Sequence, residues 1–262
     1  MTEGRRRSQG IAAERAGFAD HFSATSVQYR EARPAYPAAL FHYLAVTCPA
    51  TKSAWDCATG NGQAAIGLAE RFVSVLATDP SPEMIAQAPP HPRVRYRVTK
   101  YDSGLPGRSV DLVTIAQALH WVDVDELMRE VRRVLVPDGV FAAWCYSNCR
   151  VAPAIDEVFD HFYAVTLGAY WPAERRHVEN GYQSIALPID EMAAPPLQMV
   201  EEWSLGHYLG YIRTWSGLQK FVAARGEAPV LEFEQQVKAL WGGDALRRTV
   251  RWPLHWRIGQ IR

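Results

Sequence analysis

Short apolar segments alternate with amphipathic ones between residues 54 and 146. The apolar segments SAWDCA, SVLATD, VDLVTIAQAL and VFAAWCY predict buried strands, and the alternating segment RVRYRVTKYD predicts a further strand. Between them, GQAAIGLAERF, SPEMIAQA and DVDELMREVRRVL predict helices, the second with Ser81 as N-cap and Pro82 in its first turn. Strict alternation of strand and helix predicts a doubly wound α/β fold with a mainly parallel sheet and helices on both faces.

The regular alternation ends at Tyr146. Helical patterns follow near residues 207–225 and 227–240, and PPLQMVEEWSL predicts another strand. In the last segment, TVRWPLHWRI, apolar residues alternate with polar or small ones, which is typical of a strand. Because proline cannot donate to a strand ladder, Pro253 indicates an edge strand or a bulge.

These patterns divide the chain into three parts. We expect residues 1–19 to be a mobile N-terminus and residues 20–149 to be the ligand-binding core. Residues 150–262 are expected to supply a helical lid insertion and the terminal strands that complete a seven-stranded sheet. The expected architecture is therefore one core with one smaller covering region.

Composition narrows the classes of function. With 28 Lys and Arg residues against 28 Asp and Glu residues, the chain has no net field that would attract nucleic acid or an acidic membrane. No apolar run is long enough to cross a bilayer, and the N-terminal arginines are not followed by the apolar segment of a secretory signal. The four cysteines form no C-x-x-C pair and no zinc-finger spacing, so we expect reduced thiols, no metal and a cytoplasmic protein.

The segment WDCATGNGQ carries the candidate chemistry. A strand ending in Asp56 is followed by Gly60 and Gly62, which allow a close approach of the backbone to a ligand. The helix that follows offers unpaired N–H groups to an electronegative group. GNGQAA formally matches the dinucleotide fingerprint G-x-G-x-x-A, and Asp79 ends the next strand, where ribose hydroxyls are bound. An NAD(P)-dependent oxidoreductase is therefore one hypothesis.

The position of Asp56 disfavours a dinucleotide. An acid at the tip of the first strand, facing the turn, would repel a pyrophosphate at a cost on the order of 1 kcal/mol, but it would attract an ammonium group. A ligand that combines a ribose, a base and an amino acid fits Asp56, the glycine turn and Asp79 together. That ligand is S-adenosylmethionine. We therefore interpret Asp56 as the partner of a cation.

The chain resembles the class I S-adenosylmethionine-dependent methyltransferases of the type 11-like group, well over about residues 20–146 and more loosely beyond. WDCATGNGQ is similar to the first motif of that family, with Ala58 in place of the usual glycine, where a positive φ would be costly. The resemblance implies that Asp79 binds both ribose hydroxyls, that Met84 packs on the adenine and that Asp102 lies near the adenine amine. DLVTIAQALHW and RRVLVPDGVF are similar to the fourth-strand motif and to the helix, turn and strand that follow it.

YREARPAYP and ALHW together resemble a narrower group of bacterial and fungal enzymes that includes the trans-aconitate methyltransferases, which esterify small carboxylates. The family resemblance implies that Tyr29 and Arg33 close over the cofactor. The alternative is that both residues only anchor the N-terminal arm.

The segment QALHW leaves the fourth strand at the carboxyl edge of the sheet, where doubly wound folds bind ligands. We expect Gln117 to contact the cofactor there. We expect His120 and Trp121 to line the acceptor pocket, with His120 as the general base if the acceptor is a phenol or an enol.

Aromatic residues are abundant in the expected lid. Trp171, Tyr211 and Trp215 are candidates for an apolar wall over the acceptor, and Arg213 beside them is a candidate carboxylate clamp. The helical spacing of Tyr211 and Trp215 fits a hydrophobic core equally well.

Together these features predict an enzyme that transfers a methyl group from S-adenosylmethionine to a small-molecule acceptor, as a monomer or a homodimer. The acceptor atom is a carboxylate, phenolic or enolic oxygen, a nitrogen or a carbon. A carboxylate needs no general base, whereas a phenol or an enol would benefit from one. Two alternatives stay open: the NAD(P)-dependent oxidoreductase, and a non-catalytic protein that binds the cofactor on the same fold.

Overall fold

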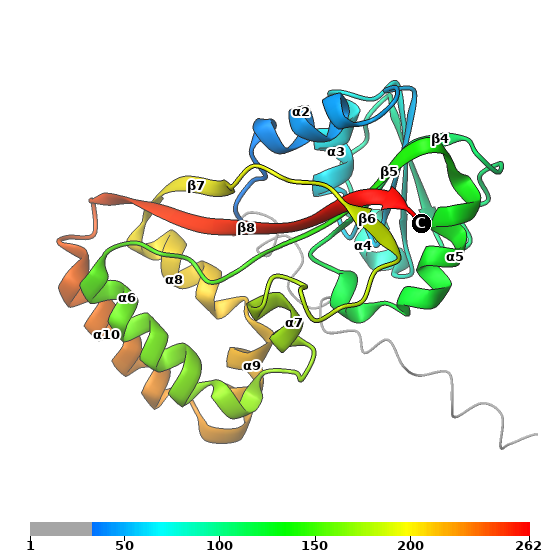
Figure 1. Ribbon diagram of the computed structural model, residues 1–262. Helices are drawn as coiled ribbons and strands as arrows, with labels where there is room; N and C mark the ends of the chain where they lie inside the picture. Colours follow the sequence, from blue (N-terminus) through cyan, green and yellow to red (C-terminus); the bar gives the residue numbers. More distant parts are fainter. Residues whose placement is uncertain (1–32) are drawn as a thin grey trace, which may run out of the picture.

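One sheet forms the centre of the computed structural model, which describes residues 33–262 (Figure 1). Its strands are β1 (Ser53–Cys57), β2 (Ser74–Asp79), β3 (Val94–Val98), β4 (Val110–Ala116), β5 (Leu135–Tyr146), β6 (Ile189–Glu191), β7 (Leu197–Ser204) and β8 (Arg247–Ile261). The strand order is β3-β2-β1-β4-β5-β8-β6, with β7 paired to β8. The first five strands in this order are parallel, whereas β8 is antiparallel to β5. The predicted doubly wound, mainly parallel fold is confirmed.

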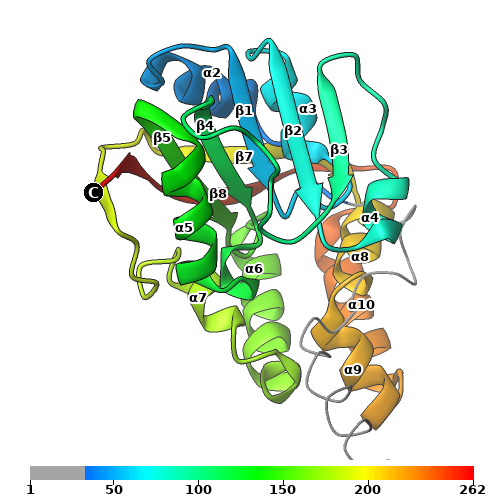
Figure 2. The same cartoon turned by 90° about the vertical axis from the view of Figure 1, so that its right-hand side faces the viewer.

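Helices cover both faces of the sheet because successive residues of a strand point to opposite sides. Ala54 faces the side on which α2 (Ala38–Thr47) and α3 (Gln63–Ala69) pack. The next residue, Trp55, faces the side covered by α5 (Val124–Val134). Figure 2 shows α5 on one side of the strands and α2 and α3 on the other.

The helix starts follow local signals in the sequence. The Ser81 hydroxyl accepts a hydrogen bond from the Met84 amide at 3.2 Å, as predicted for the N-cap of α4 (Pro82–Ala86). The Asp123 carboxylate caps α5 in the same way, accepting from the Glu126 amide at 3.0 Å. Each cap satisfies one of the amides that the first helical turn leaves unpaired.

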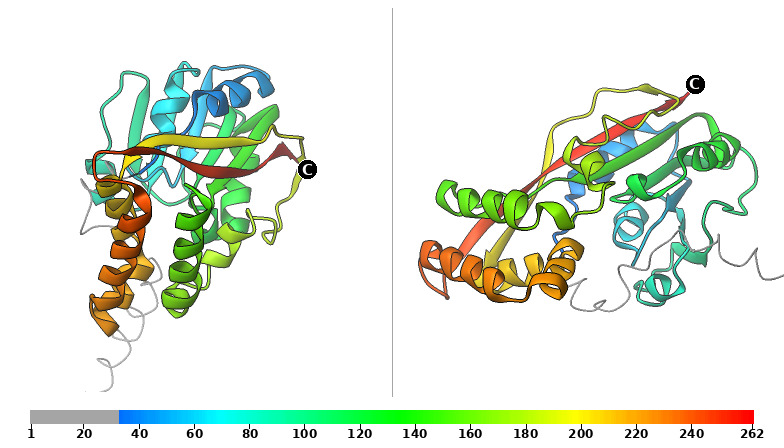
Figure 3. Two further views of the ribbon diagram at one scale, coloured as in Figure 1. Left: turned by 90° about the vertical axis from the view of Figure 1, so that its left-hand side faces the viewer. Right: turned by 90° about the horizontal axis from the view of Figure 1, so that it is seen from below.

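A mainly helical region is packed on β7 and the first half of β8, which extend beyond the parallel strands (Figure 3). Ring contacts join its parts. The ring centres of Trp203 in β7 and Trp252 in β8 are 4.7 Å apart, and those of Tyr208 and Trp241, on two different helices, are 5.3 Å apart. The segments after β5 are α6 (Pro153–His161), η3 (Phe162–Thr166), η4 (Gly168–Tyr170), α7 (Arg175–Glu179), α8 (Leu205–Arg213), α9 (Ser216–Arg225) and α10 (Ala228–Trp241). A short turn, η2 (Leu119–Trp121), follows β4.

Two sequence predictions about the sheet need correction. The sheet has eight strands and not seven, because β7 pairs with the overhanging half of β8. The strand containing Pro253 is not at an edge, since β8 lies between β5 on one side and β6 and β7 on the other. The Pro253 carbonyl accepts from the Ser147 amide at 3.3 Å, so its missing N–H faces the side on which β5 has already ended at Tyr146. Proline therefore removes no bond from the ladder between β5 and β8.

Some expectations fall on residues that the structure does not describe. The N-terminal segment 1–19 and Tyr29 lie outside the described residues. Within residues 33–262, no helix has the length and apolarity that crossing a bilayer requires.

Gly67 of α3 is expected to be irreplaceable because α2 lies directly against it. A Cβ atom at Gly67 would lie 2.1 Å from the ring of Phe41, whereas one at Gly210 in α8 would meet no atom within 4 Å. Gly67→Ala should lower the free energy of unfolding by about 1–3 kcal/mol through overpacking. Gly210→Ala should be neutral or raise it by up to about 1 kcal/mol, because alanine favours helix. Urea denaturation of both variants checks this, and equal effects would contradict the close packing of α2 on α3.

Candidate active site

The carboxyl ends of β1, β2 and β4 surround one cavity of about 350 Å³. This volume lies within the range of about 300–1,000 Å³ that small-molecule sites occupy. Its lining residues come from the loops that follow these strands, from the residues before α2 and from the end of β5. They are Arg33, Tyr36, 58–61, 63–64, 79–84, 116–118, 121–122 and Tyr146.

The loop between β1 and α3 has an unusual backbone. Gly60 and Gly62 have φ angles of 58° and 85°, in the left-handed region. Ala58 also has a positive φ of 52°, which corrects the expectation that alanine would avoid this conformation. A residue with a Cβ loses about 1–2 kcal/mol in the left-handed region, so the surrounding contacts hold Ala58 in a strained state. The Thr59 amide, which donates to the Thr78 carbonyl at 2.9 Å, is one such contact.

Asp56 supports this loop from behind and does not line the cavity. Its side chain is fully buried, and its two carboxylate oxygens accept hydrogen bonds from Thr59 at 2.5 Å and Thr114 at 2.7 Å. The Ala65 amide is a third donor. Burial, opposed by these donors and assisted by the nearby charge of Asp79, raises the pKa of Asp56 to about 6. Asp56 is therefore engaged by donors of the protein and is absent from the cavity lining, and its contact with an ammonium group stays a prediction.

Asp79 does line the cavity, at the end of β2. Its oxygens accept from the Gly60 amide at 2.8 Å and from the Ser81 amide at 2.9 Å, which ties the loops after β1 and β2 together. Burial raises the pKa of Asp79, while the same two backbone donors counteract that rise. Since each carboxylate oxygen can accept more than one hydrogen bond, Asp79 keeps acceptor capacity toward a ligand.

Gln117 and Tyr146 join β4 to β5 at the edge of the cavity. The Gln117 side chain accepts from the Tyr146 amide at 2.9 Å, and its own backbone has a positive φ of 56°. Positive φ is rare for a residue with a long side chain and is concentrated at functional sites. Gln117 therefore lies where the sequence placed it, in a backbone conformation that the sequence did not predict.

Met84 and Arg33 also line the cavity, in agreement with their expected places in the site. A Cβ atom at Gly60 would lie 3.3 Å from the terminal methyl of Met84, so the side chain faces the glycine loop. The Arg33 guanidinium donates to the Tyr146 hydroxyl at 2.8 Å and lies 5.4 Å from the centre of the Tyr211 ring.

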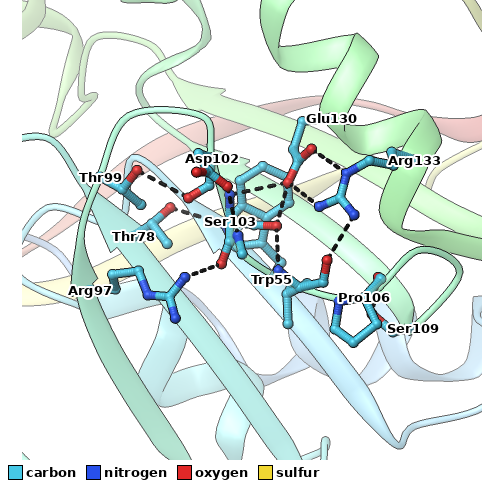
Figure 4. Close-up of polar contacts among 12 residues, drawn as sticks. Trp55, Thr78, Arg97, Thr99, Asp102, Ser103, Pro106, Ser109, Glu130 and Arg133 are labelled. Atoms are coloured by element: carbon cyan, nitrogen blue, oxygen red, sulfur yellow. Dashed lines mark hydrogen bonds and ion pairs between the residues drawn. The ribbon is translucent and has the colours of Figure 1, made fainter.

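Asp102 is not among the lining residues of the cavity, so its place near the adenine amine stays a prediction. Its exposed carboxylate accepts only from the Gly104 amide, at 3.0 Å, among the described residues. The loop itself is held by Ser103, whose amide and hydroxyl donate to Glu130 of α5 at 3.1 and 2.5 Å. Figure 4 shows this network and the ion pair of Glu130 with Arg133. Ser103 and Glu130 carry the loop, and Asp102 is turned toward solvent.

His120 and Trp121 have different environments although they are neighbours. Trp121 lines the cavity, whereas His120 is turned toward Tyr182, with 3.0 Å between its Nδ1 and the tyrosine hydroxyl. Burial, together with the charges of Arg175 and His177, lowers the pKa of His120 to about 3. A base this weak is poorly matched to proton abstraction at neutral pH. His120 does not line the cavity, so its role as general base stays a prediction, and its ring centre lies 4.8 Å from that of Trp121.

The four expected lid residues do not line the cavity. Tyr211 and Trp215 are 3% and 6% exposed and belong to the helical core, as their spacing allowed. Trp171 is half-buried and donates to the Tyr163 carbonyl at 3.1 Å. Arg213 is paired with Glu234 at 2.6 Å and with Glu227 at 3.2 Å, so it is not available as a clamp for a substrate carboxylate.

Sequence reasoning missed several lining residues. Tyr36 and Tyr146 line the cavity, but they come from an apparent linker and from the end of a buried strand. Thr59 and Thr114, the donors to Asp56, gave no signal because single threonines are common in any strand or loop. The only available clue to Tyr36 was its place in the YREARPAYP segment.

A protein family and several known proteins are similar to this chain. The family described as "Methyltransferase domain" matches residues 55–143. A solved structure named as a type II methyltransferase of Anaeromyxobacter dehalogenans is 44% identical, covers 87% of this chain and 97% of its own, and has a TM-score of 0.84. A protein of Dictyostelium discoideum named as a methyltransferase is 28% identical, over 91% of this chain and 94% of its own. A protein of Saccharomyces cerevisiae named as an S-adenosylmethionine-dependent methyltransferase is 31% identical, over 46% and 45% of the two chains.

The role of Asp79 predicts a specific loss of cofactor affinity. Asp79→Ala removes a charged acceptor at the cavity, and hydrogen bonds to charged groups contribute about 1.5–3 kcal/mol, so the Kd for S-adenosylhomocysteine should rise about tenfold to a hundredfold. Asp111→Ala is the matched control, because this buried carboxylate accepts from the Lys52 and Ser53 amides at the other end of the strands. Calorimetry should show an unchanged Kd for the control. Equal weakening in both variants would mean that Asp79 acts only through the fold.

The raised pKa of Asp56 predicts a pH-dependent difference in stability. Because the folded state binds this proton more tightly, the contribution of Asp56 is fully present below about pH 4 and is lost as the pH rises through about 6. Asp56→Asn has no such dependence. The free energy of unfolding of the variant minus that of the parent should therefore increase by up to about 3 kcal/mol between pH 4 and 7. Urea denaturation at four pH values checks this, and a constant difference would contradict the raised pKa.

Proposed function

This chain belongs to the class I S-adenosylmethionine-dependent methyltransferases, and we propose that it methylates a small organic acceptor at an oxygen already ionised at neutral pH, in the first place a carboxylate. Family membership replaces the oxidoreductase and non-catalytic alternatives. The family does not specify the methyl acceptor. The cavity lining supports a choice among the possible acceptor classes.

The described residues fit the cofactor. Asp79 offers an acceptor for the ribose hydroxyls, Met84 an apolar surface for the adenine, and Arg33 a cation for the amino-acid carboxylate. Gly60, with no Cβ and a positive φ, leaves the backbone of its loop open to a close approach. The cofactor supplies a methyl group that is already activated on a sulfonium. The protein therefore has to orient the acceptor and exclude water, and orientation of this kind is worth effective molarities of about 10⁵ M or more.

The observation that carries the proposal is the composition of the cavity lining. No lining residue of the cavity within 33–262 is a histidine, lysine or cysteine. Of the two acids, Asp79 ends β2 and Glu83 lies in α4, where it accepts from the Ser81 hydroxyl at 2.9 Å. His120, the candidate base on this turn, is hydrogen-bonded to Tyr182 and is not among the lining residues. An acceptor that is already ionised needs none.

The charge and size of the cavity support a small acceptor. Arg33 is the single cation among the lining residues that the structure describes, whereas a nucleic acid needs many phosphate contacts along a basic groove. Ala116, Ala118, Trp121 and Val122 provide an apolar wall after β4. A few polar groups on an apolar wall are typical of sites for small organic molecules.

The proposal predicts which acceptors react and how their rates depend on pH. With isotopically labelled S-adenosylmethionine, small carboxylic acids should give methyl esters at rates that are flat between pH 7 and 9, because carboxyl groups are ionised above about pH 5. Phenols, with pKa values of about 10, should react slowly near pH 7, and their rate should rise about tenfold with each pH unit. Mass spectrometry of the products measures both. Phenol methylation at a rate independent of pH near neutrality would reveal a base and overturn the proposal.

A further inference from the structure

Arg175, the first residue of α7, has uncharged partners among residues 33–262. Its Nε donates to the Tyr163 hydroxyl at 2.9 Å, and its Nη2 donates to the Asn148 side-chain oxygen at 3.1 Å. Its guanidinium lies 5.3 Å from the centre of the Trp171 ring and 5.7 Å from that of Tyr163. Glu179 accepts from the Tyr163 hydroxyl at 2.5 Å and forms no ion pair with the guanidinium.

This environment differs from that of the arginines that form ion pairs. Between residues 33 and 262, carboxylates lie within 4 Å of five arginines, namely Arg133, Arg150, Arg213, Arg257 and Arg262. Arg175 is half-buried and has no such partner in this part of the chain. Its Nη1 donates to no described residue and is not fully enclosed. A half-buried guanidinium loses hydrogen bonds to water. A carboxylate that accepts two hydrogen bonds from its N–H groups would replace them.

Arg175 lies next to the wall of the cavity that the acceptor is proposed to contact. Its partner Asn148 is two residues from Tyr146, a lining residue, so their Cα atoms are at most about 7.6 Å apart. Helix α7 packs against η2, which carries Trp121. Figure 2 shows α7 beyond the carboxyl ends of the parallel strands, on the side of α5. The charge of Arg175 also contributes to the lowered pKa of His120, so its field reaches this turn.

We propose that Arg175 binds a carboxylate of the methyl acceptor other than the atom that receives the methyl group, so that the enzyme selects an acceptor with a second anionic group. This inference rests on the proposed function, since it assumes a small acceptor at the Trp121 wall. Asn148 and Tyr163 fix the orientation of the guanidinium, and Trp171 supports its plane. Arg175 thus takes the clamp role that the sequence suggested for Arg213, and Trp171 contributes to the acceptor site through Arg175.

Turnover with matched acceptors tests this role. The probes are linear dicarboxylates from malonate to adipate and their monoamides, and the measured quantity is the ratio of kcat/KM between each acid and its monoamide. The wild-type ratio for the best length should exceed about ten, because charge-assisted bonds contribute about 1.5–3 kcal/mol. In Arg175→Gln the ratio should fall to about two, the number of equivalent carboxylates, while the Kd for S-adenosylhomocysteine is unchanged. Arg176→Gln, at the exposed neighbouring position, should keep the wild-type ratio.

A binding measurement keeps the inference testable if Arg175→Gln fails to fold. Calorimetry on the wild-type complex with S-adenosylhomocysteine should detect binding of the preferred dicarboxylate and none of its neutral diamide. Arg175→Lys, which keeps the charge without the fork, should give an intermediate ratio. A wild-type ratio near two, an unchanged ratio in Arg175→Gln, or equal binding of diacid and diamide would overturn the inference.

Failure of the proposed function has a different signature. If only phenols are methylated, 4-hydroxybenzoate and 4-hydroxybenzamide replace the acid and monoamide. A preference for the benzoate that Arg175→Gln abolishes would support Arg175 as the anion anchor even though the ionised-oxygen proposal had failed. No preference would overturn both.

Discussion

The hydrogen bonds from the Gly60 and Ser81 amides to the Asp79 carboxylate are the constraint on which the cofactor site depends. They join the loops after the paired strands β1 and β2, together with the bond from the Thr59 amide to the Thr78 carbonyl. Behind them, Asp56 accepts from Thr59 and Thr114 and so joins the same loop to β4. Two buried carboxylates are costly, and backbone and hydroxyl donors offset that cost. The result is a loop whose strained backbone is fixed before any ligand binds.

The parts of the fold that local patterns determine were predictable from sequence. The strands of the parallel sheet and the Ser81 cap follow from apolar periodicity and side-chain-to-backbone bonding within a few residues. Pro253 shows the limit of this reasoning. A proline excludes a ladder bond only on the side that its N–H would face. Whether a strand lies on that side depends on where β5 ends, more than a hundred residues earlier in the chain.

The candidate site was predicted in position but not in orientation. Asp79, Gly60 and Met84 line the cavity because strand ends and the turns after them are fixed locally. The orientation of His120 depends on Tyr182, and the availability of Arg213 depends on Glu227 and Glu234. Such partners are distant in sequence, and a single amino-acid sequence gives no signal for them. The residues around an arginine in the sequence therefore do not show whether it forms an ion pair in the fold.

The two ends of the cavity differ in how their charges are satisfied, and this difference bears on specificity. At the cofactor end, Asp79 and Asp56 are held by donors of the protein itself, so that end is already in place for one invariant ligand. At the proposed acceptor end the wall is apolar, and the printed partners of nearby Arg175 within residues 33–262 are neutral, so under the proposal the acceptor supplies the missing charge. Desolvated ionic groups discriminate strongly because an uncharged ligand leaves them unpaired. It follows that a substitution in the region after β5 can change the acceptor without altering the methyl donor, since the two ends share the sheet edge but not their polar partners.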